Sequence, residues 1–295
     1  MAKHSSQRRW YRPEGRENSM RVTSLFIYPV KSLRGTPVET FEMTTRGPLH
    51  DREWMLVDAS TGVFLSQRAT PQLARFEPTL RSTGVLSIRS PSSETQLEVP
   101  VLADHGRRDV TVWKDRFSAI DCGDEPARWF SRAVGTGCRL VRMADDVSRR
   151  LDPSYVRDPA AQTGFADGYP VLVTNQASLD ELNARLERPV PMNRFRPNVV
   201  VSGPNAWAED TWARLDIGRV GFDAVKPCAR CTVITTDQFS GERPGGKEPL
   251  ETLASHRTRP SMGATFGMNL VPKMATGTLR VGDPLTVLQY REPHG

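Results

Sequence analysis

The sequence predicts a mainly β (α+β) fold of two β-rich domains with a few short helices. From Arg21 onward, short apolar runs are broken by Gly, Pro, Asn and Asp about every 8 to 12 residues, as in β-sandwiches and β-barrels. Many of these runs are rich in Val, Ile and Thr, which favour strands. Long βαβ units and repeats of about 20 to 50 residues are not expected, which argues against doubly wound and solenoid folds.

The strand candidates are apolar runs bounded by turn-forming residues. They cover residues 22–28, 38–43, 54–58, 85–89, 110–113, 199–202, 220–225 and 232–236. Near the end of the chain, two apolar runs within residues 277–288 flank Gly282 and Asp283, a pattern that predicts a hairpin.

Helices are few and are located by their caps. One begins at Asp124, with a proline in its first turn, and ends at Gly135. A second begins at Asn175 or Ser178, with leucines three and four residues apart on its buried side. A third, short helix is expected over residues 249–255.

The length of 295 residues favours two domains. The boundary is predicted between Arg142 and Thr163, where the chain is polar and has no clear apolar period. The expected organisation is a disordered basic tail over residues 1–20, an N-terminal domain over 21–145 and a second domain over 146–291.

The net charge of +6 is modest, and residues 1–20 supply half of it with five basic and two acidic side chains. The remaining +3 fits one anionic ligand better than a nucleic acid. No apolar run reaches 18 residues, so no membrane span is expected. The four cysteines do not form a secreted disulfide framework, which favours a cytoplasmic protein.

The pair Cys228-Ala-Arg-Cys231 admits several interpretations. Structural zinc is disfavoured because no paired cysteines or histidines complete a four-ligand set. An iron–sulfur cluster needs a different cysteine spacing. A thioredoxin-like dithiol needs a helix N-terminus, whereas the β-branched run over residues 232–236 predicts a strand.

Two interpretations of the pair stay open. Both cysteines could be small buried apolar residues. Alternatively, Lys226 and Arg230 beside them favour a thiolate, and one thiolate at a strand start suits a metal whose other ligands come from an organic cofactor.

Basic residues follow or precede several predicted strands. Lys31 and Ser32 follow the first strand, Arg52 precedes the strand at residue 54, and Arg196 precedes the strand at residue 199. Each could be a solvated strand end, since Lys and Arg are mostly exposed. Together they are typical of an anion-binding cradle, in which Arg supplies a two-pronged donor and Lys a point charge.

These motifs together resemble a known family. Tyr-Pro-Val-Lys-Ser, Asp-Arg-Glu-Trp, Asn-Arg-Phe-Arg-Pro-Asn, Pro-Cys-Ala-Arg-Cys, Lys-Glu-Pro-Leu-Glu-Thr-Leu and Val-Gly-Asp-Pro occur in this order over residues 21–288. The chain resembles a MOSC protein of the mitochondrial amidoxime-reducing component type. The resemblance implies a MOSC N-terminal β-barrel domain over residues 21–145 and a MOSC domain over 146–291.

The resemblance also implies a molybdenum cofactor, with a pyranopterin dithiolene supplying two sulfurs and Cys231 a third as the metal ligand. The other cofactor-binding positions that it implies are Lys31, Ser32, Arg52, Thr174, Asn175, Arg196, Ala229, Arg230 and Asn269. The implied reaction is the reduction of hydroxylamines and amidoximes to amines and amidines.

Asp237, which follows the predicted ligand strand, is the candidate proton donor, although an Asp there is also a common turn cap. The sequence has no dinucleotide-binding Gly motif after a strand, so we expect a separate electron donor: a b-type cytochrome or ferredoxin with a flavoprotein reductase. We expect a monomer. The alternative function is a sulfur-carrier or cofactor-handling module that uses a cysteine persulfide.

Overall fold

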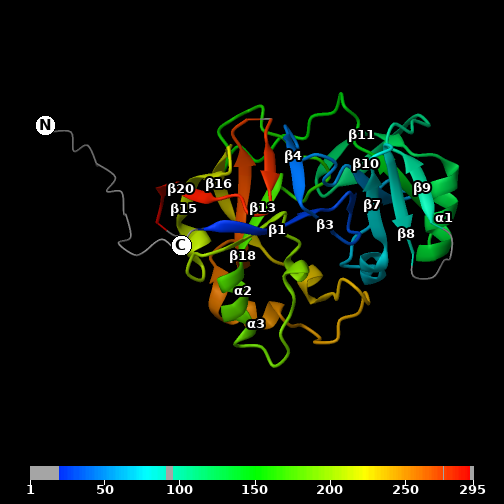
Figure 1. The fold of residues 1–295 in the computed structure, drawn as a ribbon. Helices are drawn as coiled ribbons and strands as arrows, with labels where there is room; N and C mark the ends of the chain where they lie inside the picture. The colour runs from blue at the N-terminus through cyan, green and yellow to red at the C-terminus, as the bar shows by residue number, and fades with distance from the viewer. Residues whose placement is uncertain (1–19, 91–95, 275, 293–295) are drawn as a thin grey trace, which may run out of the picture.

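The computed structural model describes residues 20–90, 96–274 and 276–292, and its largest element is a nine-stranded sheet (Figure 1). The strands of this sheet are β1 (Arg21–Ile27), β3 (Thr36–Val38), β13 (Val171–Asn175), β14 (Val199–Ser202), β15 (Trp212–Ile217), β16 (Val220–Ala229), β17 (Thr258–Arg259), β18 (Gly263–Pro272) and β20 (Leu285–Tyr290). Their order is β20-β15-β16-β18-β13-β14-β1-β3, and β17 pairs with β18. The first strand of the chain therefore joins the sheet of the C-terminal half.

Three smaller sheets complete the β structure. Five strands run in the order β10 (Arg107–Val112), β11 (Asp115–Asp121), β12 (Cys138–Arg142), β6 (Trp54–Asp58) and β2 (Val30–Lys31). One three-stranded sheet is β7 (Glu77–Arg81), β8 (Val85–Arg89) and β9 (Leu97–Pro100), and the other is β19 (Thr278–Arg280), β4 (Thr40–Thr44) and β5 (Gly47–Pro48). The mainly β fold class is confirmed, although strand pairing among the described residues follows open paths rather than a closed ring.

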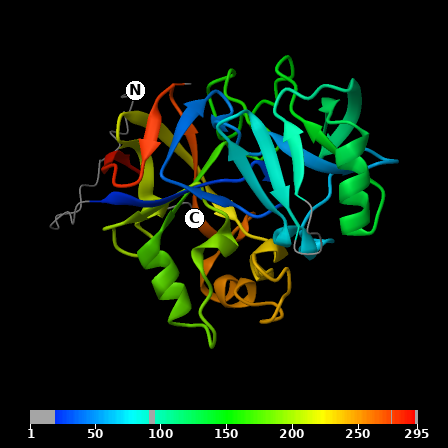
Figure 2. The same cartoon turned by 45° about the vertical axis from the view of Figure 1, so that its right-hand side comes forward.

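Helices begin and end close to where their caps predict. Helix α1 (Asp124–Val134) packs against β12 and ends at Gly135, whose φ of 81° suits glycine. Helix α2 (Gln176–Asn183) begins after Asn175, whose side chain accepts a hydrogen bond from the Ala177 amide at 3.1 Å. Helix α3 (Leu250–Arg257) covers the third predicted position. Figure 2 shows α2 and α3 together below the large sheet.

The short helical turns are η1 (Pro71–Arg75), η2 (Met192–Phe195), η3 (Ala208–Thr211) and η4 (Thr232–Thr235). Within the described part of the chain, every helix is too short or too polar to cross a membrane. The predicted disordered tail lies outside the described residues, apart from Met20.

Each half has its own apolar core. The large sheet buries a cluster around Trp212 and Phe222, to which β1 contributes Val22, Leu25 and Ile27. The N-terminal half buries a separate cluster around Trp54 and Phe130. Strand β1 coincides with the predicted strand over residues 22–28 to within one residue, whereas β9, along which burial alternates, was not among the predicted strands.

The predicted strand over residues 232–236 is wrong, because this segment is the helical turn η4. Strand β16 ends at Ala229. Beyond it, the Arg230 amide still donates a hydrogen bond to the Ala264 carbonyl of β18 at 2.8 Å. The Thr235 hydroxyl then donates to the Thr232 carbonyl at 2.8 Å, so a local threonine bond replaces strand pairing. Cys231 therefore precedes a short turn instead of opening a strand.

Two further expectations about topology are wrong. The predicted hairpin over residues 277–288 does not form, because β19 pairs with β4 whereas β20 pairs with β15. The turn at Asp283 is present, with its carboxylate accepting from the Arg280 amide at 2.8 Å. Among the described residues, α2 also connects the parallel neighbours β13 and β14, which makes a βαβ unit where none was expected.

Candidate active site

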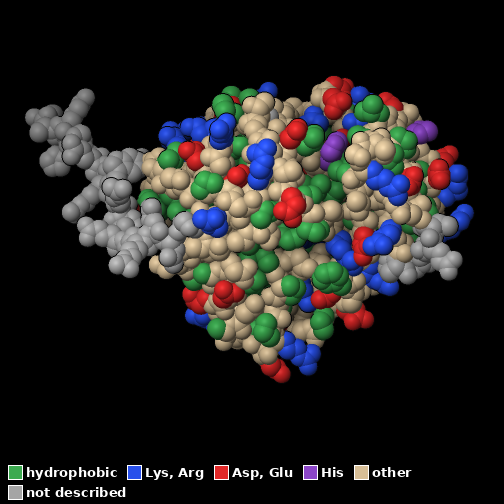
Figure 3. Space-filling model, viewed as in Figure 1, with side chains coloured by type: hydrophobic (Ala, Val, Ile, Leu, Met, Phe, Trp, Pro, Cys, Tyr) green, Lys and Arg blue, Asp and Glu red, His purple; other side chains and the backbone are tan. Residues whose placement is uncertain are grey.

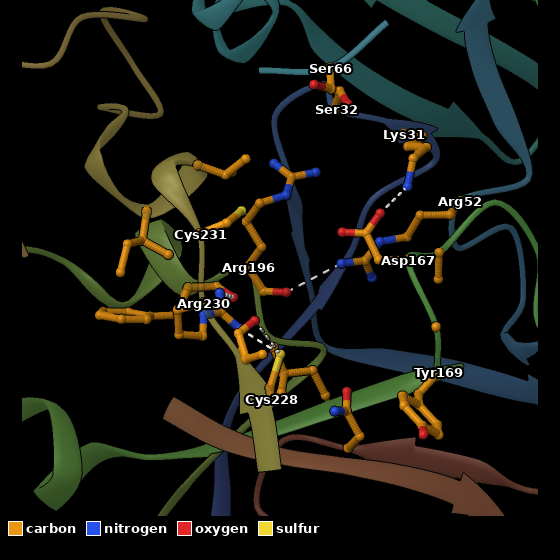
Figure 4. Close-up of a pocket in the computed structure, with 18 of the residues that line it drawn as sticks. Lys31, Ser32, Arg52, Ser66, Asp167, Tyr169, Arg196, Cys228, Arg230 and Cys231 are labelled. Carbon is orange, nitrogen blue, oxygen red and sulfur yellow. Dashed lines mark hydrogen bonds and ion pairs between the residues drawn. The ribbon is translucent and has the colours of Figure 1, made fainter. Parts of the chain in front are cut away.

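A pocket of about 400 Å³ lies where segments from both halves of the chain meet (Figure 4). Figure 4 shows Lys31, Arg52 and Asp167 on one side of it and the two cysteines on the other, with Arg196 between them. The predicted site residues that line this pocket are Lys31, Ser32, Arg52, Arg196, Ala229, Arg230, Cys231 and Asn269. Sequence segments more than 200 residues apart thus form one site.

Arg52 and Arg196 both lie over the ring of Tyr28, with guanidinium carbons 4.0 and 4.4 Å from its centroid. Arg52 donates to Asp51 at 2.6 Å and to the Arg196 carbonyl at 3.2 Å. Burial lowers the pKa of Arg196 to about 10, so the side chain remains charged at neutral pH. Burial also raises the pKa of Tyr28 to about 12, which keeps the phenol protonated.

The backbone at these two arginines is unusual. Arg52 and Arg196 have φ values of 48° and 54°, a left-handed conformation that costs a non-glycine residue about 1 kcal/mol or more. Buried Asn198 fixes the arrangement by donating to Asp51 at 3.0 Å and accepting from Arg52 at 3.2 Å. The fold therefore fixes both guanidiniums before any ligand binds.

Lys31 forms an ion pair with Asp167, which also accepts from the Trp113 indole at 3.1 Å. Burial lowers the pKa of Lys31. Desolvation would raise the pKa of Asp167, but the adjacent Lys31 ammonium outweighs it and holds that pKa below its usual value. Arg149 supports this loop by donating to the carbonyls of Gly164 at 3.0 Å and Asp167 at 3.1 Å.

Each cysteine of the pair faces a different guanidinium. Arg230 donates to the Cys228 sulfur at 2.9 Å and to the Phe195 carbonyl at 2.6 Å. Arg68 approaches the Cys231 sulfur at 3.4 Å through its Nε atom. Both thiols are free and half-buried.

The described residues contain no group of three or more His, Cys, Asp or Glu side chains placed to hold a metal ion. A metal in this pocket would therefore take protein sulfur on one side and depend on non-protein ligands for the rest.

Comparisons with known proteins now identify the family. Residues 19–137 match the MOSC N-terminal beta barrel domain, and residues 160–286 match the MOSC domain. Mitochondrial amidoxime reducing component 2 of Bos taurus is 34% identical over 292 residues, covering 90% of this chain and 82% of that protein. The chain belongs to the MOSC family of the mitochondrial amidoxime-reducing component type.

Two other relatives of this MOSC protein bear on its function. Mitochondrial amidoxime reducing component 2 of Homo sapiens is 35% identical over 285 residues, again covering 90% of this chain and 82% of that protein. Molybdenum cofactor sulfurase of Oryza sativa subsp. japonica is 34% identical over 259 residues, which are 82% of this chain but 31% of the sulfurase. The chain thus spans about a third of that larger protein.

Three predicted site residues of the MOSC protein lie outside the pocket lining. Asn175 caps α2 and donates to the Asn205 carbonyl at 2.7 Å, and the buried Thr174 hydroxyl lies 3.5 Å from the Val199 carbonyl. Asp237 accepts from the amides of residues 239 and 240, each at 2.9 Å, and pairs with Arg194 at 3.1 Å. Its carboxylate is thus the turn cap that was the alternative interpretation.

Several pocket residues were not predicted from the sequence. The most informative of them are Ser66, Gln67, Arg68, Trp113, Asp167 and Tyr169. They lie on turns and loops whose placement depends on distant partners, such as Arg149 for the Asp167 loop. The Asp-Gly pair at residue 167 indicates a turn but not which cavity the turn faces.

Proposed function

We propose that this protein is a molybdenum-cofactor oxidoreductase that reduces N-hydroxylated compounds, such as hydroxylamines and amidoximes, with electrons from a separate carrier protein. One observation carries the proposal: a single pocket combines the Cys231 thiol with the half-buried guanidiniums of Arg52 and Arg196, which come from the two halves of the chain. The relatives named amidoxime reducing components support the same reaction.

The residues present fit such a cofactor in charge and in donor chemistry. Lys31, Arg52, Arg68, Arg196 and Arg230 line the pocket, where Asp167 is the one carboxylate among the described lining residues. This excess of positive charge suits a ligand with a phosphate group. The buried Nε of Arg230 has no hydrogen-bond partner among the described residues and could donate to a ligand atom.

In this proposal Cys231 would hold molybdenum through its sulfur. Lys31, Arg52 and Arg196 would bind the pterin and its phosphate through their positive charges, and Ser32 through its hydroxyl (Figure 4). The bound cofactor would supply the two-electron chemistry that removes the hydroxyl oxygen of the substrate as water. The residues that line the pocket would orient this group.

Proton delivery is better assigned to the Lys31–Asp167 pair than to Asp237. The Asp237 carboxylate is occupied by two backbone amides and by Arg194, outside the pocket lining. Asp167 lies in the pocket and orients Lys31, whose ammonium, with its pKa lowered by burial, could give a proton to a bound hydroxyl group.

Turnover with a chemical reductant tests the proposal directly. Purified holoprotein with reduced methyl viologen should convert benzamidoxime to benzamidine, whereas NADPH alone should give no product. Product formation is measured by liquid chromatography. Failure of reduced viologen to support turnover by molybdenum-loaded protein would refute the proposed reaction.

A sulfur-carrier function is the second candidate, because the rice molybdenum cofactor sulfurase matches most of this chain. In that case a cysteine of the pair, with Arg230 or Arg68 beside it, would carry a persulfide. Mass spectrometry after incubation with a cysteine desulfurase and cysteine would show the added sulfur on Cys228 or Cys231. A stable persulfide in protein that binds no molybdenum would favour this function.

A further inference from the structure

An exposed aromatic residue and several arginines lie together beside the pocket. Phe239 is 63% exposed, and the Arg34 guanidinium lies 4.7 Å from its ring centroid. Arg34 also donates to the Phe239 carbonyl at 3.0 Å, which fixes the loop. These contacts with Arg34 hold the Phe239 ring at the surface.

The loop that carries Phe239 packs closely on η1. At Gly241, where φ is +70°, a Cβ atom would lie 3.0 Å from the Gln72 Cα and 3.1 Å from the Arg75 Cγ. Arg243 donates to the carbonyls of Gln67 and Arg68, each at 2.9 Å. Phe239, Arg34, Arg68, Arg75 and Arg243 therefore belong to one continuous surface, here termed the Phe239 surface.

The charge of this surface is unbalanced. Within the described part of the chain, Arg68, Arg75 and Arg243 form no ion pair, and Glu242 is exposed beside them. Two other carboxylates at this surface, Glu77 and Asp237, are paired with Arg34 and Arg194. Figure 3 shows Lys and Arg side chains gathered to the lower right of centre, with an acidic side chain among them, where η1 and the loop around residue 240 meet. A partner for this surface would be acidic.

The Phe239 surface is also connected to the candidate metal ligand. Arg243 holds the Arg68 backbone, and the Arg68 side chain reaches the Cys231 sulfur at 3.4 Å. Gln238, next to Phe239, accepts from the pocket residue Arg196 at 3.0 Å. A redox centre docked on Phe239 would thus be separated from the pocket by a thin layer of hydrogen-bonded residues.

We propose that the Phe239 surface is the docking site for an acidic one-electron carrier protein, and that Arg68 links this site to Cys231. This inference rests on the proposed reductase function. Two reduced carriers dock one after the other, and each gives up one electron. These two electrons and two protons convert R–NH–OH to R–NH₂ and water. Long-range attraction between the arginines and the carrier would speed association.

The experiment compares surface variants of the full-length holoprotein. Arg75→Glu and Phe239→Ala change the Phe239 surface outside the pocket lining. Arg219→Glu and Leu288→Ala are matched controls, because both residues are exposed and lie on the far β15–β16 turn or on β20. Turnover is measured with an acidic b5-type cytochrome and with a [2Fe–2S] ferredoxin, each reduced by its own reductase, and with reduced methyl viologen.

Arg75→Glu and Phe239→Ala should each lower the carrier-dependent kcat/KM about tenfold and leave viologen-driven turnover unchanged. The wild-type rate should fall as the ionic strength rises above about 0.15 M, and Arg75→Glu should weaken this dependence. Normal carrier kinetics in both variants, or wild-type turnover with viologen but with neither carrier, would overturn the docking site.

A direct binding measurement separates this inference from the proposed function. Titration of each carrier onto immobilised holoprotein should show weaker binding for Arg75→Glu and Phe239→Ala than for the controls. If viologen fails but carrier binding still depends on these residues, the docking site holds and the reaction is wrong. Equal binding in all variants would refute the docking site.

Discussion

The two cysteines of the pocket have different neighbours, and this predicts different consequences for their loss. Cys231 lies beside Arg68, whereas Cys228 is held by Arg230. Cys231→Ser should abolish molybdenum binding, because a hydroxyl is a hard and poorly ionised replacement for a thiolate. Cys228→Ser should retain most of the metal. Metal analysis of both variants checks the assignment, and the reverse pattern would make Cys228 the ligand.

Arg196 tests the binding of an anionic cofactor group with less effect on stability than Arg52 does. Arg196→Ala should weaken cofactor retention about tenfold or more, because it removes a charge-assisted hydrogen bond of roughly 1.5–3 kcal/mol. Arg52→Ala removes the partner of buried Asp51 and should also destabilise the protein by about 3–5 kcal/mol. Pterin content and urea unfolding separate the two effects. Full pterin content in Arg196→Ala would place this arginine outside the cofactor site.

Buried Glu209 predicts a pH-dependent stability. Burial raises its pKa from the ordinary 4.5 to about 7, although the Ser178 hydroxyl donates to it at 2.8 Å. The folded state binds this proton more tightly than the unfolded chain does, so the stabilisation is complete below pH 4.5 and decreases as the pH rises toward 7. The expected loss is on the order of 3 kcal/mol.

Urea unfolding of wild type and Glu209→Gln between pH 4.5 and 8 measures this contribution. The difference in unfolding free energy between the two proteins should change across that range, since the variant cannot titrate at residue 209. Parallel pH profiles would show that Glu209 ionises without cost in the folded protein.

The site residues predicted from the sequence are mainly those in short motifs at strand ends. Lys31, Arg52 and Arg196 combine a basic side chain with a turn next to a strand, so a sequence pattern can detect them. Asp167 and Arg68 reach the pocket from loops held by Arg149 and Arg243, and no local pattern specifies those long-range contacts. Asp237 was chosen because it follows a predicted strand, but that segment is the helical turn η4, and its carboxylate caps a turn outside the pocket lining.

At the scale of elements, strand and helix positions were mostly predictable because alternation and caps act locally. Which strands pair with one another was less predictable. The 38–43 run is divided between β3 and β4 of different sheets, and η4 replaces a strand where β16 loses its partner. Intrinsic β preference cannot decide such cases, since it depends on the neighbouring strand.

Strand β18 contains a backbone position that tests this packing. At Gly267, where φ is +76°, a Cβ atom would lie 2.7 Å from the Val173 carbonyl, whereas Gly84 has a similar φ of +75° and open space around it. Gly84→Ala should cost about 1–2 kcal/mol of stability from backbone strain alone. Gly267→Ala should cost about 1–3 kcal/mol more, because overpacking adds to the strain. Equal losses in urea unfolding would contradict the close approach of β18 to β13.

At the scale of the whole molecule, the pocket exists because the chain crosses between its halves. Strand β1 joins the large sheet, and β2, which carries Lys31, then pairs with β6 of the five-stranded sheet. The sequence boundary near residue 145 divides the chain in two but does not predict this exchange. The basic residues Lys31 and Arg52 and the two cysteines consequently come from different parts of the chain and meet in one cavity.

The central claim is that this cavity holds a molybdenum cofactor through Cys231. The most direct measurement is the molybdenum and pterin content of purified protein from cells that make the cofactor, compared with Cys231→Ser prepared in parallel. The claim predicts about one molybdenum and one pterin per wild-type chain, and no molybdenum in a variant that is folded by circular dichroism. Equal molybdenum in both proteins, or none in the wild type, would contradict it.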